Sequence, residues 1–269
     1  KLKDTGFFVL EPGDLSVDIA IENRYQVYLK SINGSASLQE VKDFLIFKSK
    51  NISLSNLPDL MMVRLEKMFK LEPRSQFAGI LLADLMTDRQ LPYRYAQKLY
   101  NLLDKKTQDK EDLQKIETLL SAMSKTQVGS QLPDIAFDSE KGSLKLSAAR
   151  KKLTLVLFTA SDCIPCVEAT RQFADLYKNY HQSHGFTIYA VYLDHERNTW
   201  LDHIHREGYR FPTVIAPKKL KDETLKSLAI TQIPTNFLID ESGKILAVNI
   251  SPKGVHRGLD PEAAAYVPV

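Results

Sequence analysis

The chain's only two cysteines stand three residues apart, in the run Cys163-Ile164-Pro165-Cys166. An apolar stretch of strand length, Thr154 to Ala160, leads into them, and apolar residues at spacings of three and four follow, which is typical of one face of a helix. The pair is therefore expected where a strand turns into a helix. At that end of a helix the backbone N–H groups are unpaired and the dipole is positive, so a thiolate at Cys163 is stabilised.

This placement predicts thiol chemistry with two distinct roles. Cys163 is the expected nucleophile, and Cys166, about one turn further along the helix, is close enough to resolve a mixed disulfide. Pro165 at an early helical position loses no hydrogen bond that the helix needs. The residues therefore point to exchange between a dithiol and a disulfide.

Two other interpretations of the pair remain open. A structural zinc site needs further ligands, but there is no second cysteine pair, and His203 and His205 are two apart, so on a helix they point to different sides. An inert structural disulfide is the second alternative. Closing a four-residue loop removes little entropy from the unfolded chain, so such a disulfide stabilises a chain of 269 residues only weakly.

Length and composition indicate an ordinary globular protein of two domains. The chain has 269 residues, 43% of them hydrophobic and 26% charged. The net charge of +3 comes from 36 basic and 33 acidic residues spread along the sequence, and the longest basic cluster, Lys218 to Lys221, is short. No nucleic-acid partner is expected from this distribution.

Nothing in the sequence predicts a membrane span or a secretory signal. No stretch approaches eighteen consecutive apolar residues, and the opening Lys1 to Asp4 lacks the pattern of a signal peptide. An export segment removed from the chain is compatible with this opening. Two cysteines in a redox spacing suit either the cytosol or an oxidising compartment.

The first half of the chain is predicted to be mostly helical. Two short β-like runs, 7–10 and 15–19, flank a Pro12-Gly13 turn and predict a small hairpin. Helical periodicity then extends from about Ser37 to Lys125. Turn formers near 128–134 end it, so we expect a β-hairpin plus helical domain at residues 1–126, a second domain at 127–255, and a tail at 256–269 with a short helix near 260–265.

The second domain is predicted to be α/β, a mixed sheet flanked by helices. The expected strands are Ile135–Phe137, Leu144–Leu146, Leu153–Ala160, Phe186–Leu193, Thr235–Asp240 and Lys244–Ile250. The expected helices are Cys163–Tyr180, Asn198–Glu207 and Asp222–Leu228.

From Val128 to about Gly254 the chain resembles the thioredoxin-fold thiol-disulfide oxidoreductases of the TlpA/ResA type, which are related to the alkyl hydroperoxide reductase and thiol-specific antioxidant superfamily. Four stretches in order carry this resemblance: Gly129 to Asp134, the strand with its Cys-Ile-Pro-Cys, Ile233 to Asp240, and Gly243-Lys244. The part before them is similar to the domain that precedes such modules in Bacteroidetes-type proteins, through Leu10 to Gly13 and the helical segment.

The resemblance implies a reductase that exchanges its Cys163–Cys166 disulfide with protein substrates in the periplasm or cell envelope. It implies protein thiol or disulfide partners, an upstream electron donor or acceptor, no cofactor and no metal. It also implies a cis Ile233-Pro234 bond facing the cysteines, with the backbone of Ile233 free to pair with a bound chain. The expected substrate-binding residues are Ile164, Pro165, Ile233 and Pro234, and the catalytic ones are Cys163 and Cys166.

Two positions depart from the family, and no acid-base helper replaces the one that is missing. Asp162 replaces the aromatic residue usual before the first cysteine, and its carboxylate disfavours a thiolate at Cys163. Leu157 stands where thioredoxins carry a buried acid. Glu168 is predicted to lie on a solvated helix face rather than to assist proton transfer.

Two functions other than dithiol–disulfide exchange require different residues around the cysteines. A peroxidase is not expected, because peroxiredoxins carry a Thr three residues before the reactive cysteine and a preceding Pro, whereas this chain has Ala160 there, Thr159 one residue earlier, and no such proline. A redox-inert binding or assembly module is the serious alternative to the enzyme, since Asp162 and Leu157 leave the cysteines poorly tuned.

Overall fold

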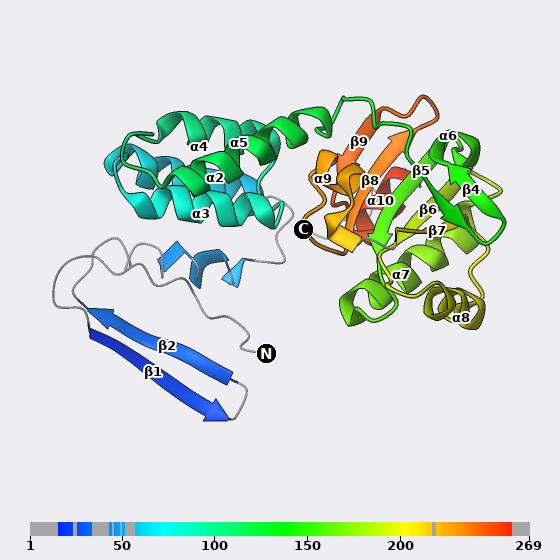
Figure 1. The fold of residues 1–269 in the computed structure, drawn as a ribbon, viewed down its shortest axis with the longest axis horizontal. Coiled ribbons are helices and arrows are strands. Elements are labelled where there is room, and N and C mark those ends of the chain that lie inside the picture. Colours follow the sequence, from blue (N-terminus) through cyan, green and yellow to red (C-terminus); the bar gives the residue numbers. More distant parts are fainter. Residues whose placement is uncertain are drawn as a thin grey trace. The chain divides into compact units, whose positions relative to one another are not determined.

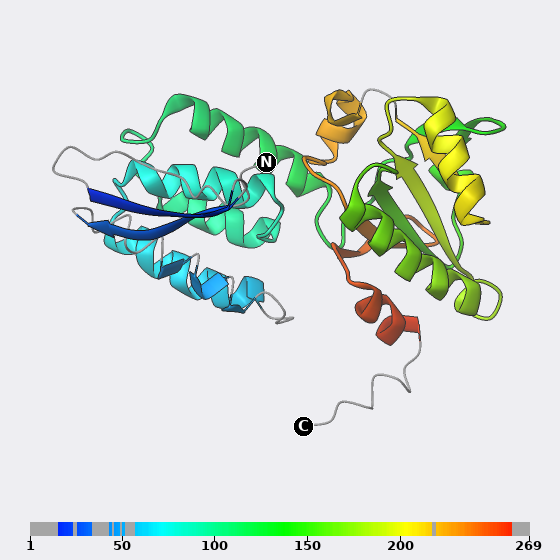
Figure 2. The same ribbon diagram turned by 90° about the horizontal axis from the view of Figure 1, so that it is seen from below.

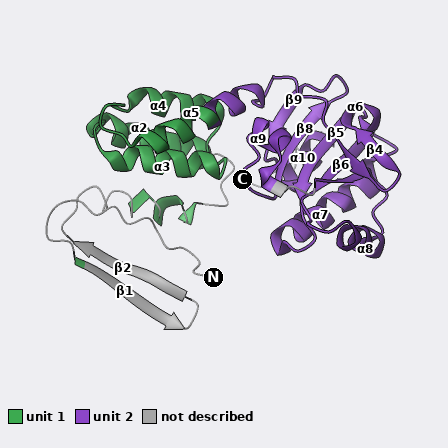
Figure 3. Ribbon diagram, in the orientation of Figure 1, with its two compact units in different colours: residues 1–118 green, residues 119–269 purple. Residues whose placement is uncertain are grey.

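The computed structural model describes residues 16–23, 26–33, 43, 44, 46–48, 50, 51, 57–216 and 219–259 (Figure 1). The chain divides into two compact units, residues 1–118 and 119–269 (Figure 3). Helix α5 (Lys110–Lys125) runs across this division and ends where the sequence predicts the first domain to end. Each unit is described by itself below.

The first unit contains a hairpin and a group of helices, as the sequence predicts. Strands β1 (Ser16–Asn23) and β2 (Gln26–Asn33) pair antiparallel. The helices are α2 (Leu57–Leu71), α3 (Gln76–Thr87), α4 (Tyr93–Leu102) and α5, with shorter helical stretches at 43–44 and 46–48.

The hairpin differs in position from the expected one. The predicted run 15–19 does contribute to a strand, β1, but this strand pairs with β2. The other predicted run, 7–10, and the Pro12-Gly13 turn lie outside the described residues. β2 contains valine, tyrosine and isoleucine, which favour strands, but no Gly or Pro separates it from β1, so no turn former marks this hairpin in the sequence.

Helix α3 forms the centre of the first unit. Eight of its twelve residues are buried, which matches the apolar sequence that predicted a mostly buried helix. Pro92 is the N-cap of α4, where the missing N–H costs nothing. Leu99 of α4 and Ile116 of α5 are completely buried. The core of this unit is therefore made by the helical faces that the periodicity marks.

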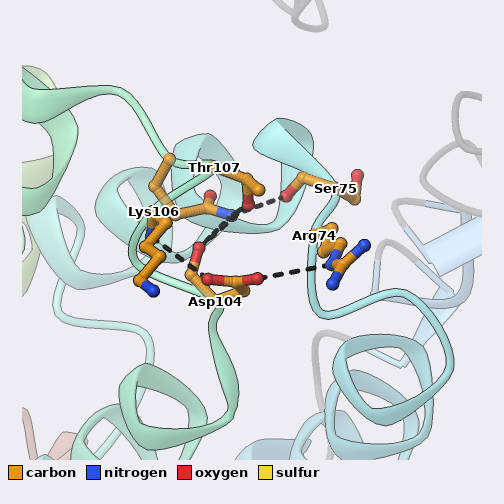
Figure 4. A network of polar contacts seen from close by, with 6 residues as sticks. Arg74, Ser75, Asp104, Lys106 and Thr107 are labelled. Carbon is orange, nitrogen blue, oxygen red and sulfur yellow. Dashed lines mark hydrogen bonds and ion pairs between the residues drawn. The ribbon is translucent and has the colours of Figure 1, made fainter.

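A polar network joins two loops of the first unit (Figure 4). Asp104 donates its N–H to the Pro73 carbonyl (2.8 Å), and its carboxylate pairs with Arg74 at 3.4 Å. Gln108 donates to the Ser75 carbonyl at 3.2 Å and accepts from the Gly79 N–H at 3.1 Å. Gln108 is 7% exposed, and these bonds satisfy its buried amide. The turn between α4 and α5 is thereby tied to the start of α3.

The second unit is built on a seven-stranded mixed sheet of order β4-β3-β7-β6-β5-β8-β9 (Figure 1). The strands are β3 (Ala136–Ser139), β4 (Gly142–Lys145), β5 (Leu153–Thr159), β6 (Phe186–Tyr192), β7 (Thr213–Ile215), β8 (Thr235–Asp240) and β9 (Ile245–Val248). Central β5 runs parallel to β6 and antiparallel to β8. The mixed α/β architecture is the one predicted.

Besides the end of α5, six helical segments among the described residues of this unit accompany the sheet. They are α6 (Leu146–Ala149), α7 (Ile164–Tyr180), α8 (Arg197–Glu207), the 3-10 turn η1 (Lys219–Lys221), α9 (Glu223–Ser227) and α10 (Pro252–Leu259). The long helices and the six expected strands are confirmed, with ends that differ by one or two residues in most cases. Strand β7 is not predicted, because three residues are too few to show a period of two.

Helix α10 is also absent from the sequence prediction. Val255 and Leu259 are buried, and Tyr180 of α7 hydrogen-bonds His256 at 3.0 Å. Packed structure therefore continues to Leu259, into the segment expected to be a tail. The helix expected near 260–265 lies outside the described residues.

Figure 2 shows the sheet of the second unit together with its helices. The side chains of β5 alternate between two cores. Leu155 and Leu157 pack with residues of α7, α8 and α10 on one face. Val156 and Phe158 pack with residues of α6, α9 and the segment before β3 on the other. Because both faces of the strand are covered, its sequence is a continuous apolar run and not an alternating one.

One ion pair joins α7 to α8. The Arg171 guanidinium donates from Nε and Nη2 to the two oxygens of Glu207, at 2.8 and 2.7 Å. These hydrogen bonds hold the pKa of Glu207 below its ordinary value. A carboxyl whose pKa is lower in the folded state stabilises the fold above its ordinary pKa and loses that contribution as the pH falls through the folded pKa.

We therefore expect Arg171→Gln to lower the free energy of unfolding slightly near neutral pH, and by less near pH 3. The free energy of urea unfolding at the two pH values checks this, followed by fluorescence of Trp200, the only tryptophan of the chain and completely buried in this unit. Lys178→Gln is the control, since Lys178 pairs with Asp175 on the exposed surface. An equal loss at both pH values contradicts the prediction.

Candidate active site

The two cysteines lie where β5 gives way to α7, as the sequence predicts. β5 ends at Thr159, and α7 begins at Ile164. Cys163 is the N-cap residue, with extended backbone at φ −102° and ψ 104°, and its carbonyl accepts the N–H of Val167 at 3.0 Å. Pro165 occupies the first turn of the helix. Unpaired N–H groups and the positive end of the helix dipole therefore lie beside Cys163.

The cysteines form a disulfide in this structure and differ in exposure. Their Cα atoms are 5.2 Å apart. Cys163 is half-buried, whereas Cys166 is completely buried. Only the sulfur nearer the surface is open to another molecule, so the geometry fits Cys163 as the group attacked or attacking and Cys166 as the resolving group.

Two exposed apolar residues follow Cys163 in the chain. Ile164, between the cysteines, is 82% exposed, and Pro165 is exposed as well. This places two of the four predicted substrate-binding residues at the surface next to Cys163.

The other two precede β8. The Ile233-Pro234 peptide bond is cis, which confirms that expectation. In the pairing of β5 with β8, Thr235 lies opposite Phe158, so Pro234 comes just beyond the end of the ladder, at the edge of the sheet where β5 leads into the cysteines. Ile233 and Pro234 are both partly exposed there. The register thus places Ile233 and Pro234 beside the carboxyl end of β5, the end from which the chain continues to the cysteines.

The family departures are visible in the structure. Leu157 is completely buried in the apolar core. Asp162 and Glu168 are both exposed, Glu168 on α7, which agrees with its expected place on a solvated helix face. His203 is buried and His205 is exposed, so these two do point to different sides of α8.

A pair of hydroxyls supports the backbone at Cys166. The Thr170 hydroxyl donates to the Cys166 carbonyl at 2.7 Å, and its oxygen lies 3.1 Å from the hydroxyl oxygen of Thr159. Because a hydroxyl has one hydrogen, Thr159 is the donor to Thr170. Both threonines are buried, and this chain of hydrogen bonds links the last residue of β5 to the first turn of α7.

The structure adds one residue that sequence reasoning missed. Asp194, 3% exposed, follows β6 and accepts hydrogen bonds from Ser161, two residues before Cys163. The Ser161 N–H lies 3.1 Å from Oδ2 and 3.4 Å from Oδ1, and the Ser161 hydroxyl donates to Oδ1. An acidic residue directly after a continuous apolar strand was the available signal, since that position ends beside the next strand of a parallel pair.

A cavity in the second unit lies away from the cysteines. It measures about 770 Å³ and lies between α7 and the turn after α8, lined by residues that include Tyr177, His181, Tyr209 and Phe211. Neither cysteine borders it. In the described residues, no helix is both long and apolar enough to cross a bilayer.

Comparisons with known proteins agree with this geometry. The sequence model of a family described as thioredoxin-like matches residues 151–245. The thiol-disulfide oxidoreductase ResA of Geobacillus thermodenitrificans is 32% identical over 119 residues, 44% of this chain and 66% of that protein. ResA of Bacillus subtilis is 26% identical over 121 residues, 45% of this chain and 65% of that protein. The chain thus spans just under two thirds of the length of these relatives.

Two solved structures are similar to part of the chain. A thiol-disulfide oxidoreductase from Bacteroides fragilis is 32% identical with a TM-score of 0.44, covering 48% of this chain and 97% of that one. The thioredoxin domain of a thiol-disulfide oxidoreductase from Bacteroides vulgatus is 28% identical with a TM-score of 0.45, covering 49% of this chain and 98% of that one.

Proposed function

Because residues 151–245 are a thioredoxin-like segment similar to the ResA oxidoreductases, we propose that this chain is a thiol-disulfide oxidoreductase acting on protein substrates. The observation that carries the proposal is the pairing of a half-buried Cys163 at the start of a helix with a completely buried Cys166 one turn behind it. We propose that it acts as a reductase and that it is located in the periplasm or cell envelope.

In the proposed cycle the reduced domain gives two electrons to a substrate disulfide. The Cys163 thiolate attacks one substrate sulfur, a mixed disulfide forms, and the other substrate sulfur leaves as a thiolate that takes up a proton. The Cys166 thiol then loses its proton, and its thiolate attacks the Cys163 sulfur. This step closes the Cys163–Cys166 disulfide and releases the second substrate thiol. A dithiol donor of the upstream pathway returns the domain to its reduced state.

The apolar surface beside Cys163 supports binding of an extended protein segment. Ile164 and Pro165 offer exposed apolar contacts, and the backbone of Ile233 lies at the end of β8, where a bound chain can pair with it. We propose that these residues and Pro234 hold the substrate. No cofactor or metal has a part in this mechanism, since two sulfurs exchange all the electrons.

The remaining part of the chain has a proposed role in partner choice. We assign residues 127–255 to the catalytic domain and residues 1–126 to positioning a partner protein. The comparison of the full chain with a version that lacks residues 1–126 tests this assignment. An unchanged preference among protein disulfide substrates would remove it.

The reduction potential of the cysteine pair tests the function. The protein is equilibrated in graded thiol buffers, free thiols are trapped by alkylation, and the products are counted by mass. A reversible two-electron midpoint near −270 mV, about that of thioredoxin, is the expected result for a reductase, and one near about −120 mV indicates an oxidase. A pair that never forms or never gives up its disulfide contradicts the exchange mechanism and supports a redox-inert binding module.

A further inference from the structure

We propose that Asp194 is a positioning residue that acts through Ser161 to limit ionisation of the Cys163 thiol and thereby favour the disulfide. The biological role of this effect rests on the proposed function, because the ionisation of Cys163 changes how strongly the cysteine pair reduces a substrate. The step itself concerns one carboxylate, one serine and one thiol, and it can be measured without turnover.

The contacts place the carboxylate of Asp194 at the redox turn. Both of its oxygens face Ser161, which offers a backbone N–H and a hydroxyl. Ser161 and Cys163 are two residues apart, so their Cα atoms are within about 7.6 Å of each other. Any change in this charge or in its hydrogen bonds therefore acts directly on the backbone that carries the reactive sulfur.

Burial makes this charge differ from its acidic neighbours. Asp162 and Glu168 are exposed, as are His195 and Glu196 in the segment after β6, so water and salt screen them. Asp194 is 3% exposed and is screened much less. It is therefore the acidic group near Cys163 whose charge has the longest reach.

The neighbours of Asp194 on its other side do not neutralise it. Burial lowers the pKa of His203, which keeps that imidazole uncharged near neutral pH. Burial, then Tyr209 and Asp194, raise the pKa of Tyr192, which stays a neutral phenol. Among the described residues Asp194 forms no ion pair, so the two donors of Ser161 supply its main stabilisation.

The chemical consequence is a shift in redox balance. A negative charge near Cys163 disfavours its thiolate, so the dithiol is less stable relative to the disulfide and the pair becomes a stronger reductant. The same charge compensates in part for the positive end of α7, which acts in the opposite direction. In this way the chain has a buried acid at its redox turn, although Leu157 stands at the position where thioredoxins carry theirs.

The test compares Asp194→Asn, Ser161→Ala and the double variant, each in the full chain with Cys166→Ser so that Cys163 is the only thiol. The readout is the rate of alkylation of Cys163 by iodoacetamide near pH 6. Asp194→Asn removes the charge, and we expect it to raise the rate about tenfold, because a buried and little-screened charge no longer disfavours the thiolate. Ser161→Ala leaves the charge with one donor fewer, and we expect it to slow the reaction about threefold.

The double variant distinguishes an effect of Ser161 through the charge of Asp194 from an effect through a disturbed backbone. If Ser161 acts through the charge, its replacement has no further effect once Asp194 is asparagine, so the double variant alkylates at the rate of Asp194→Asn. In chains that keep both cysteines, and at a pH where Cys163 of the reduced chain is ionised, Asp194→Asn should raise the reduction potential by about 30 mV, which corresponds to a tenfold change. A purely structural role predicts changes in one direction from both single variants, and that result overturns the proposal.

Circular dichroism and the fluorescence of Trp200 verify that each variant is folded. If Asp194→Asn does not fold, Ser161→Ala decides alone: slower alkylation supports the proposal, and an unchanged or faster rate overturns it. An alkylation rate within twofold of the parent in folded Asp194→Asn also overturns it. Failure of the proposed function has a different signature, the lack of a reversible redox midpoint in the parent chain.

Discussion

Cys163→Ser is expected to reduce protein-disulfide exchange to the uncatalysed level, whereas Cys166→Ser is expected to stop turnover after the first step and to accumulate a mixed disulfide. The reason is the difference in exposure: Cys163 is open to a substrate, and Cys166 is completely buried behind it. Without Cys166, nothing in the domain releases the substrate bound at Cys163.

The measurement is mass spectrometry of each reduced variant after mixing with a protein that contains one disulfide. Cys166→Ser should gain the mass of the substrate, and a reducing agent should remove it. Cys163→Ser should gain none, since the remaining sulfur is inaccessible. Ile164→Ala serves as the matched control within the same turn, because it keeps both sulfurs and is expected to weaken substrate binding while leaving resolution intact. Equal trapping by the two serine variants contradicts the assigned roles.

The largest stability effect is expected from Phe158→Ala. Phe158 is completely buried on central β5, and its ring meets that of Phe237 edge to face with centroids 6.1 Å apart. Truncation removes this contact and leaves a cavity between the sheet and its cover, so the free energy of unfolding should fall by about 3–5 kcal/mol. Leu246→Ala, at a side chain 42% exposed on the edge strand β9, should change it by less than about 0.5 kcal/mol.

Urea unfolding followed by Trp200 fluorescence measures both changes. Trp200 is the only tryptophan and lies in the same unit, so its signal reports the unfolding of that unit and not of the other. Similar losses in the two variants would show that the packing of β5 does not limit the stability of the sheet.

Local patterns in the sequence predict most of the fold and the centre of the site. The apolar run of β5, the helical period of α7 and the Cys-Ile-Pro-Cys spacing are neighbours in the chain, so their arrangement follows from short-range rules. The cis bond at Pro234 is implied by the family resemblance, and the structure confirms it. These features need no knowledge of which strand pairs with which.

What the sequence does not predict depends on contacts between distant segments. Strand β7 has only three residues, and it is a strand because it pairs with β6 rather than because of its own composition. Asp194 lies 33 residues after Ser161, and only the parallel pairing of β5 with β6 brings them together. The order of the strands in the sheet brings such distant residues into contact, and the local spacing of apolar residues does not reveal that order.

That order has a consequence for how the protein is made. β5 is hydrogen-bonded on both sides, to β6 and to β8, and β8 lies about eighty residues later in the chain. During synthesis the central ladder therefore stays incomplete until residue 240 is available, and pairings of such long range form slowly. The cysteines, three residues apart, can meet much earlier, because closing so short a loop takes little time. A nascent chain in an oxidising compartment can thus acquire its disulfide before it acquires its sheet.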